Sequence, residues 1–310
     1  MAGPGKDLRG KSVVLTGGTS GIGFAAAHEL AGRGASIFNI SRSAARCRDA
    51  QDRILREFPD ARIVFHVADL SSQRLVRKAA QAACAWARDS AGRGLDILIN
   101  NAATVSSWYA STEDGYELQF AVNYLAPFLL AHELLPVLRA APAARIVTVS
   151  SGSHRHTRLH WPDVMLRRRY SPLLAYQQSK LANMMFTREW NERWAQGPRL
   201  RAYAADPGLV NTEIGLKDTH GLARWVWEKR RARGVTPEIG VRTVGFLAAD
   251  PSVEGSHEIY WKDCRPARLH PYALRAEEAE RLWALSERLC GITPPSPPGH
   301  SIPALAAPGS

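Results

Sequence analysis

A glycine-rich turn between the first predicted strand and the first predicted helix constrains the fold of this chain most. The run Ser12–Thr16 is rich in β-branched residues, which favours a strand, and residues 24–32 are rich in Ala and Leu, which favours a helix. Between them the glycines follow the pattern Gly17-x-x-x-Gly21-x-Gly23. Such glycines let backbone N–H groups approach an anion at a helix N-terminus, where the helix dipole adds to the attraction. The turn therefore predicts a site for a dinucleotide pyrophosphate.

The alternation of strand and helix continues along the chain. Predicted strands cover residues 35–40, 62–67, 96–99, 145–149 and 200–205, and predicted helices cover residues 44–58, 75–88, 116–140 and 176–194. Apolar strands suit a parallel sheet buried on both faces, and strands joined by helices form right-handed βαβ units. We therefore predict a single α/β domain over residues 1–292, a Rossmann-type doubly wound parallel sheet flanked by helices on both faces. The Pro-rich segment 293–310 is expected to be a disordered tail.

The end of the second predicted strand bears on the choice of cofactor. It reads Asn39-Ile40-Ser41-Arg42 and holds no carboxylate, the group that would accept hydrogen bonds from the ribose diol of NAD. Arg42 instead offers a forked cation suited to a 2′-phosphate, with Ser41 as a second donor. The sequence therefore predicts NADP(H), with NAD(H) as the alternative. A solvated loop arginine is the other interpretation of Arg42.

A tyrosine and a lysine stand one helical turn apart, at Tyr176 and Lys180. A tyrosine has an ordinary pKa of about 10, so it exchanges a proton near neutrality only when that pKa is lowered. A cation one turn away favours the phenolate and lowers the pKa. The spacing therefore predicts Tyr176 as a general acid/base. The pattern YxxxK occurs by chance in many proteins, but here Leu181-Ala182-Asn183 follows it.

Taken together, these motifs resemble the short-chain dehydrogenase/reductase family from about Leu8 to Ile292, and its retinol dehydrogenase-like and carbonyl reductase-like members in particular. The resemblance implies that Tyr176 is the acid/base and that Lys180 lowers its pKa and binds the nicotinamide ribose. It also implies that Ser151 hydrogen-bonds the substrate oxygen and that Asn123 holds a water for proton relay. Because residue 150 is a serine as well, the serine assignment could be displaced by one position.

The resemblance also implies which residues lie along the cofactor. Asp69 matches a residue that contacts the adenine. Asn100 begins the family's Asn-Asn-Ala-Gly motif, which here ends in Ala103, and Asp206 stands before Pro-Gly where related reductases often carry His. The expected cofactor-binding residues are Gly17, Thr19, Ser20, Gly21, Ile22, Gly23, Ser41, Arg42, Asp69, Leu70, Asn101, Ala102, Tyr176, Lys180, Pro207, Gly208, Val210 and Thr212.

Two further segments are expected near the substrate. Residues 153–170 form a long insertion between the predicted serine and tyrosine, read as a surface loop that flanks the substrate entrance. Its histidines have no nearby cysteine or carboxylate cluster, so no metal site is predicted. Residues 215–234 carry Trp225 and Trp227 beside several basic residues, and we expect them to form a substrate lid. Contact of this segment with a membrane surface is the less favoured interpretation.

Composition excludes several other classes of partner and location. The net charge is +11, but 33 Arg and 7 Lys are scattered through the sequence without a binding motif, so no nucleic-acid partner is expected. The four cysteines lack ligand spacing, and the N-terminus lacks the apolar segment of a signal peptide. The most apolar stretch, residues 121–138, contains Asn123, His132 and Glu133 and makes a poor membrane span. A cytoplasmic protein is predicted, and a homo-oligomer stays open.

The sequence thus predicts an NADP(H)-dependent oxidoreductase that moves a hydride between the nicotinamide and a small hydrophobic carbonyl or alcohol. One alternative is an extended-branch sugar-nucleotide epimerase or dehydratase, which shares YxxxK but has another glycine spacing and a larger C-terminal domain. The other is a non-catalytic NADP-binding regulator, although such proteins commonly lose the tyrosine.

Overall fold

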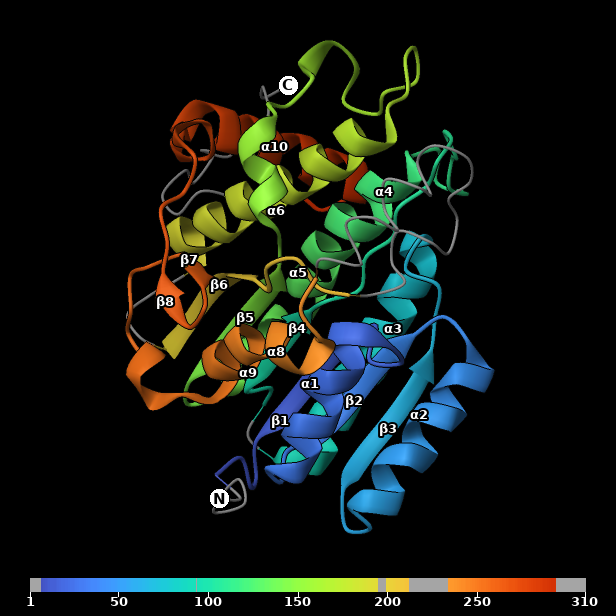
Figure 1. The fold of residues 1–310 in the computed structure, drawn as a ribbon, viewed down its shortest axis with the longest axis vertical. Helices are drawn as coiled ribbons and strands as arrows, with labels where there is room; N and C mark the ends of the chain where they lie inside the picture. The colour runs from blue at the N-terminus through green and yellow to red at the C-terminus, as the bar shows by residue number, and fades with distance from the viewer. Residues whose placement is uncertain (1–6, 93, 195–198, 212–233, 294–310) are drawn as a thin grey trace, which may run out of the picture.

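One eight-stranded sheet runs through the molecule (Figure 1). The computed structural model describes residues 7–92, 94–194, 199–211 and 234–293. The strand order is β3-β2-β1-β4-β5-β6-β7-β8, with every pair parallel except β7 and β8. The strands are β1 Ser12–Thr16, β2 Ser36–Ser41, β3 Arg62–Val67, β4 Ile97–Asn100, β5 Ala144–Val149, β6 Leu200–Asp206, β7 Tyr260–Lys262 and β8 Arg265–Pro266.

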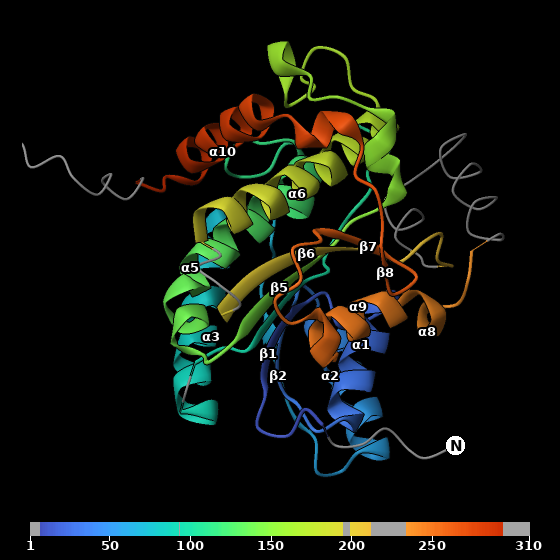
Figure 2. The same cartoon turned by 90° about the vertical axis from the view of Figure 1, so that its left-hand side faces the viewer.

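Helices cover both faces of the sheet, and Figure 2 shows the three layers. On one side lie α3, α5 and α6, with α10 packed outside α6, and on the other lie α1, α2, α8 and α9. The bounds are α1 Gly21–Gly32, α2 Ala44–Glu57, α3 Gln73–Ala91, α4 Leu118–Phe120, α5 Ala126–Ala140, α6 Pro172–Trp194, α8 Pro237–Gly240, α9 Arg242–Ala249 and α10 Ala276–Cys290. The predicted doubly wound α/β fold is confirmed.

Burial explains why apolar runs predicted these strands. Every residue of β1, β2, β4 and β6 is buried, because helices pack on both faces of the sheet. The edge strand β3 differs, since Val64 and Val67 are 46% and 49% exposed.

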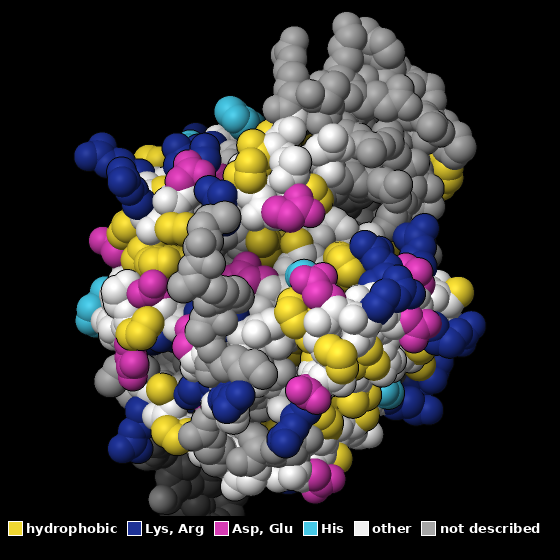
Figure 3. Space-filling model, turned by 60° about the horizontal axis from the view of Figure 1, so that its bottom comes forward, with side chains coloured by type: hydrophobic (Ala, Val, Ile, Leu, Met, Phe, Trp, Pro, Cys, Tyr) yellow, Lys and Arg dark blue, Asp and Glu magenta, His cyan; other side chains and the backbone are white. Residues whose placement is uncertain are grey.

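Figure 3 shows Lys and Arg side chains among Asp and Glu on one face of the molecule, so positive charge is spread there rather than gathered.

Four helices begin at positions other than those predicted from the sequence. Two of them, α1 and α3, begin two or three residues earlier, at Gly21 and Gln73. The helix expected over residues 116–140 begins at Leu118, and Ala121–Leu125 forms a π-helical turn before α5. The Glu117 carboxylate caps the start of α4 by accepting hydrogen bonds from the N–H groups of Gln119 and Phe120. The helix expected from Tyr176 begins at Pro172, since a proline fits the first helical turn, where its missing N–H has no partner to lose.

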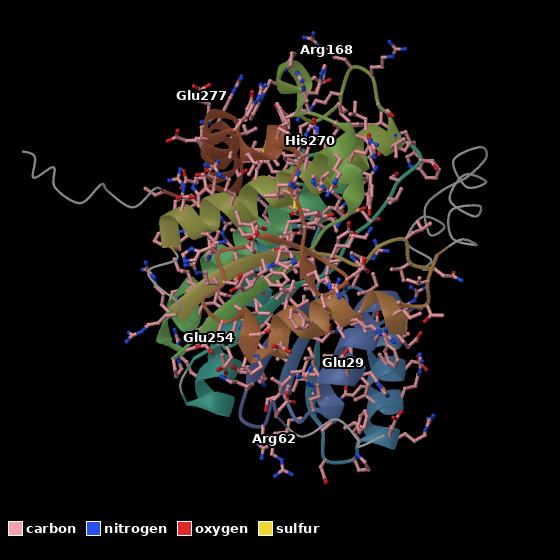
Figure 4. All side chains as sticks on the ribbon, turned by 60° about the vertical axis from the view of Figure 1, so that its left-hand side comes forward. Glu29, Arg62, Arg168, Glu254, His270 and Glu277 are labelled. Atoms are coloured by element: carbon pink, nitrogen blue, oxygen red, sulfur yellow. The ribbon has the colours of Figure 1, made fainter. Side chains whose placement is uncertain are left out.

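The insertion between β5 and α6 packs on α6 rather than standing away from it. Gln178 of α6 holds the insertion in place. The Gln178 side chain accepts a hydrogen bond from the His160 N–H at 2.8 Å and donates one to the Val164 carbonyl at 2.7 Å. Arg168 lies at the top of the molecule, and Arg62, where β3 starts, lies at the opposite end (Figure 4). The insertion therefore sits at the carboxyl end of the parallel strands.

Candidate active site

Four neighbouring strands bring the predicted site residues to one edge of the sheet. β1, β4, β5 and β6 lie side by side and end at Thr16, Asn100, Val149 and Asp206. The strand order reverses between β1 and β4, the position at which open α/β sheets bind ligands beyond their carboxyl ends.

The glycine-rich turn is held in shape by the strand next to it. The N–H of Gly17, whose φ is 77°, donates to the Ile40 carbonyl at 2.8 Å. The N–H of Gly18 donates to the Asn39 side chain at 2.8 Å. A Cβ at Gly23 would lie 2.2 Å from the Gly17 carbonyl oxygen, so only glycine fits there. Thr19, Ser20, Gly21 and Ile22 lead from this turn into α1 and are partly exposed.

The loop after β4 is tied to the same turn through Thr16. The Thr16 hydroxyl oxygen accepts from the N–H groups of Asn101 and Ala102, each at 3.0 Å. The Asn101 side chain donates to the Thr16 carbonyl at 2.9 Å. The structure thus brings these two predicted cofactor residues against the glycine-rich turn.

The ends of β2 and β3 form the other end of the predicted cofactor site. Ser41 is buried, and its hydroxyl accepts from the Asn39 amide at 3.0 Å, whereas Arg42 is exposed. The Ala68 N–H donates to the Ser41 carbonyl at 3.0 Å, which places Asp69 and Leu70 beside them. Both predicted pairs therefore lie together at the carboxyl edge.

Tyr176 and Lys180 lie on α6 as the spacing predicted. Tyr176 is partly exposed, whereas Lys180 is 3% exposed and its ammonium lies 5.7 Å from the centre of the Tyr176 ring. The Lys180 Nζ donates to the Val149 carbonyl at 2.9 Å. Burial lowers the pKa of Lys180 to about 8, and the negative charge of Asp206 acts in the opposite direction. A weakly held proton therefore lies one turn from the tyrosine.

The two serines after β5 have different surroundings. Ser150 is 2% exposed, and its hydroxyl donates to the Lys180 main-chain carbonyl at 3.1 Å. Ser151 is partly exposed, and its Oγ accepts from the Ser153 N–H at 3.2 Å. The Ser151 hydroxyl proton is therefore available to a substrate oxygen, which favours Ser151 over Ser150 for the predicted role.

Asn123 lies in the π-helical turn before α5 and is buried. Its side chain accepts from the Thr104 N–H at 2.7 Å and donates to the Ser179 hydroxyl at 3.1 Å. Its main-chain carbonyl accepts from the Asn183 amide at 3.0 Å. Asn123 thus joins the loop after β4 to α6, and its role in holding a water stays a prediction.

The turn after β6 completes the site. Gly208 has a φ of 73°, and Pro207 and Val210 are partly exposed. Val210 forms a parallel bridge with Val235, so the chain returns to this point after residue 233. Thr212 and the expected lid over residues 215–234, apart from Gly234, lie outside the described residues.

Two residues of the site were not among the predicted ones. Asn39 holds both the glycine-rich turn and Ser41, and a polar residue inside the buried run of β2 was its sequence signal. Tyr260 of β7 donates to the Asp206 carboxylate at 2.6 Å. The sequence offered no signal for Tyr260, because β7 is a three-residue strand 54 residues further along the chain.

These residues fit a nicotinamide dinucleotide. The glycine-rich turn opens the twelve-residue helix α1, whose first N–H groups and dipole suit a pyrophosphate. The glycines let the turn pack tightly under this helix end, since a Cβ would lie 3.0 Å from the Ala102 Cα at Gly17 and 2.2 Å from the Gly17 carbonyl oxygen at Gly23. Lys180 lies further along the same edge.

Comparison with known proteins decides the family. A sequence profile described as short chain dehydrogenase matches residues 11–222. This chain belongs to the short chain dehydrogenase family. Mouse retinol dehydrogenase 14 is 35% identical to it over 303 residues, which cover 92% of this chain and 87% of the mouse protein. The chain is thus a retinol dehydrogenase-like member, an oxidoreductase of a family that uses a nicotinamide cofactor.

Solved structures of other proteins share the fold. A protein of Mycobacterium paratuberculosis is 32% identical, with a TM-score of 0.71 over 94% of this chain and 96% of its own. A short chain dehydrogenase of Shigella flexneri, solved with NADP, has a TM-score of 0.65 over 84% of this chain and all of its own. At 21% identity the second likeness shows the fold alone.

Proposed function

We propose that this short chain dehydrogenase is an NADP(H)-dependent oxidoreductase for a hydrophobic carbonyl or alcohol, with Tyr176 as the general acid/base. The observation that carries the proposal is the position of Lys180. It is buried, one helical turn from Tyr176, with its ammonium 5.7 Å from the centre of the tyrosine ring. A buried cation at this distance favours the phenolate over the phenol and makes the hydroxyl a better acid.

The residues divide the proton transfer among them. The bound nicotinamide supplies or accepts the hydride. In reduction, the Tyr176 hydroxyl donates its proton to the substrate oxygen, and in oxidation the phenolate takes the proton back. The Ser151 hydroxyl donates a hydrogen bond to the same oxygen, where negative charge develops. Asn123 fixes the loop after β4 against α6 and so keeps these groups in register.

Arg42 supports the preference for NADP(H). It is exposed at the end of β2, two residues after Ile40, whose carbonyl holds the glycine-rich turn. A guanidinium there suits a 2′-phosphate, whereas the sequence of β2 offers no carboxylate to the ribose of NAD.

Apolar side chains around the strand ends support a hydrophobic substrate. Trp108 follows β4, Leu209 follows β6, and Leu173 lies on α6 three residues before Tyr176. They are 51%, 42% and 47% exposed. Retinal, steroid ketones, quinones and aliphatic aldehydes form the substrate panel to test with NADPH.

The acid/base role is tested with Tyr176→Phe. Loss of the hydroxyl removes the proton donor, so we expect turnover to fall by about 10²–10⁴-fold or more. NADPH affinity should stay near that of the wild type, because the phenol contributes little to cofactor binding. NADPH oxidation with a confirmed substrate and NADPH titration by fluorescence measure the two effects. A variant that keeps most of its activity would contradict the assignment and favour another acid.

The cofactor preference is tested with Arg42→Asp. A charge-assisted contact to the 2′-phosphate contributes about 1.5–3 kcal/mol, so NADPH affinity should fall about tenfold to a hundredfold while NADH affinity holds or rises. Titration of both coenzymes against both proteins measures the change. Equal affinities of the wild type for NADPH and NADH would show that Arg42 does not read the phosphate.

A cytoplasmic location is part of the proposal. The segment Leu118–Ala140 is apolar and long enough to cross a membrane, but 72% of an 18-residue apolar stretch within it is buried inside the protein. Packing into the core accounts for its composition. Fractionation of expressing cells tests the location, and recovery of the protein only with membranes would contradict it.

A further inference from the structure

A buried carboxylate lies at the end of β6, where this chain departs from the pattern of related reductases. Asp206 is 3% exposed. Its carboxylate accepts two hydrogen bonds, from the Tyr260 hydroxyl at 2.6 Å and from the Gly208 N–H at 2.9 Å. It therefore ties the turn after β6 to the neighbouring strand β7. A carboxylate is expensive to bury unless charge and hydrogen bonds compensate it, so its position calls for a partner.

Lys180 brings a positive charge to the same end of the site. Its ammonium comes from α6 to the ends of β5 and β6, where it donates to the Val149 carbonyl at 2.9 Å. Burial lowers the pKa of Lys180, and the attraction of Asp206 opposes this. The interior screens such an attraction far less than water does. One carboxylate and one ammonium thus share the buried end of the site.

Two buried titratable groups near this pair, Tyr260 and His154, are neutral at neutral pH. Burial, together with the hydrogen bond to Asp206, raises the pKa of Tyr260 well above its usual range. His154, in the short 3₁₀ helix after β5, is fully buried, and burial lowers its pKa. Its Nδ1 lies 2.8 Å from the Ser151 carbonyl, and its ring meets Tyr260 edge-on at 5.2 Å.

Three further groups lie around the pair, among them Lys262 of β7, which is in register with Asp206 and exposed. Tyr176 faces Lys180 from the same helix, and the exposed guanidinium of Arg155 lies 5.7 Å from the centre of the Tyr260 ring. Gly152 runs close to the carboxylate, since a Cβ there would lie 3.3 Å from its Oδ2. The carboxylate is therefore enclosed by β6, β7 and the turn after Ser151.

We propose that Asp206 is a positioning residue for the proton transfer, because its charge keeps Lys180 protonated and its two hydrogen bonds hold the turn at Pro207-Gly208. The inference rests on the proposed function, in which protonated Lys180 favours proton loss from Tyr176. Asp206 acts through Lys180 and Gly208 and does not itself exchange a proton with the substrate.

Replacing the charge without changing the shape separates this role from packing. Asp206→Asn keeps an oxygen for one of the two donors and removes the negative charge. Lys180 then loses its counter-charge, and its pKa should fall by at least about one unit, a tenfold loss of proton affinity. In carbonyl reduction, activity is lost as pH rises through the pKa of Lys180. The alkaline limb of the pH profile should therefore move to lower pH.

The titration of Lys180 measures this directly and needs neither cofactor nor substrate. The chain has seven lysines, so lysine labelled with ¹³C at Cε gives few NMR signals, and Lys180→Arg identifies the one from Lys180. We expect its midpoint to fall in Asp206→Asn. Tyr260→Phe keeps the carboxylate and should leave the midpoint near the wild-type value. Asp263→Asn removes the same charge from an exposed turn and should also leave it there.

An unchanged Lys180 midpoint in folded Asp206→Asn would overturn the inference. If the Asn variant does not fold, Asp206→Ser, which is neutral and smaller, gives the same comparison. A midpoint that falls equally in Tyr260→Phe would also overturn it, because packing rather than charge would then set the proton affinity. Failure of the proposed function is distinguishable, since it would appear as absent turnover with every carbonyl while the titration still follows Asp206.

Discussion

At the scale of single residues, Lys180 shows that the site is built at the expense of stability. A lysine that is 3% exposed contributes an ammonium to the core, where burial lowers its pKa from 10.5 to about 8. Below pH 8, Lys180 is protonated in both the folded and the unfolded chain, so the folded state bears the full free-energy cost of the buried charge there. As pH rises from about 8 towards 10.5, the folded chain has already lost the proton and the cost disappears.

Lys180→Met should therefore stabilise the protein while it abolishes turnover. The lowered pKa corresponds to a cost of about 3 kcal/mol in the free energy of unfolding, which Met would remove. Loss of the hydrogen bond to Val149 would destabilise the variant by about 1 kcal/mol, so we expect a net stabilisation of about 2 kcal/mol below pH 8. Urea unfolding of both proteins measures it. The gain should shrink as pH rises towards 10.5. A variant less stable than the wild type at neutral pH would show that Lys180 contributes more to folding than its burial costs.

The sequence located the residues whose spacing is local and missed those whose partners are distant. Tyr176 and Lys180 lie one helical turn apart, so their contact follows from the helix itself. Asp206 could be recognised as an unusual residue, but its bond to Tyr260 joins positions 54 residues apart. Asn39 was visible only as a polar residue in an apolar run. The partners of Asp206 and Asn39 depend on how the strands pair in the sheet, and no local sequence pattern predicts that pairing.

At the scale of elements, the first turn of α1 is packed against two loops at once. A Cβ at Gly23 would lie 2.2 Å from the Gly17 carbonyl oxygen and 2.3 Å from the Asn101 amide nitrogen. Backbone stands on one side and a hydrogen-bonded side chain on the other, so neither gives way easily. Helix, turn and the loop after β4 therefore keep one arrangement.

Gly23→Ala should disturb that arrangement. Overpacking of this kind costs about 1–3 kcal/mol, and the displaced turn should also lose its fit to the pyrophosphate. We expect a lower Tm and weaker binding of NADPH and NADH alike, by thermal unfolding and by titration. Arg42→Asp is the matched comparison, because it should weaken NADPH alone and leave Tm near that of the wild type. Normal binding of both coenzymes by Gly23→Ala would show that the turn can shift without loss.

Element boundaries were predicted less well than element types, and α5 shows why. Apolar residues marked the helix over residues 116–140, but nothing local indicated the π-helical turn Ala121–Leu125. That turn lies where Asn123 bonds to the loop after β4 and to α6. Such tertiary contacts override local periodicity. The domain boundary at Ile292 stays a prediction, because residues 294–310 lie outside the described part of the chain.

At the scale of the whole molecule, an aromatic cluster joins α5, α6 and α10 on one side of the sheet. Phe128 of α5, Phe186 and Trp190 of α6 and Trp283 of α10 are all buried in it. The Phe128 ring meets the Phe186 and Trp283 rings edge-on at 5.9 and 5.0 Å. Such rings contribute large buried area and about 0.5–1.5 kcal/mol for each pair beyond it. The cluster therefore fixes α10 to the helix that carries the site.

His132 brings a titratable group into this cluster. Its ring lies 4.3 Å from Phe128 and 5.1 Å from Trp283, and its Nδ1 lies 2.8 Å from the Phe128 carbonyl. Burial is the main cause that lowers the pKa of His132 from 6.5 to about 4. In the unfolded chain the same histidine takes up a proton near pH 6.5, whereas in the folded chain it stays neutral down to about pH 4.

His132→Phe should make the protein more resistant to acid. The neutral histidine contributes stability above pH 6.5, and this is lost as pH falls towards 4, because the unfolded chain binds the extra proton. Phenylalanine keeps an aromatic ring in the cluster and removes the titration. We expect the stability of the variant relative to the wild type to rise by about 1–2 kcal/mol between about pH 7.5 and about pH 5, measured by urea unfolding. His156→Phe, which makes the same substitution at an exposed position outside the cluster, is the control. Parallel stability curves for the wild type and His132→Phe would mean that His132 is protonated in the folded protein, and that the helices of the site tolerate a charge between them.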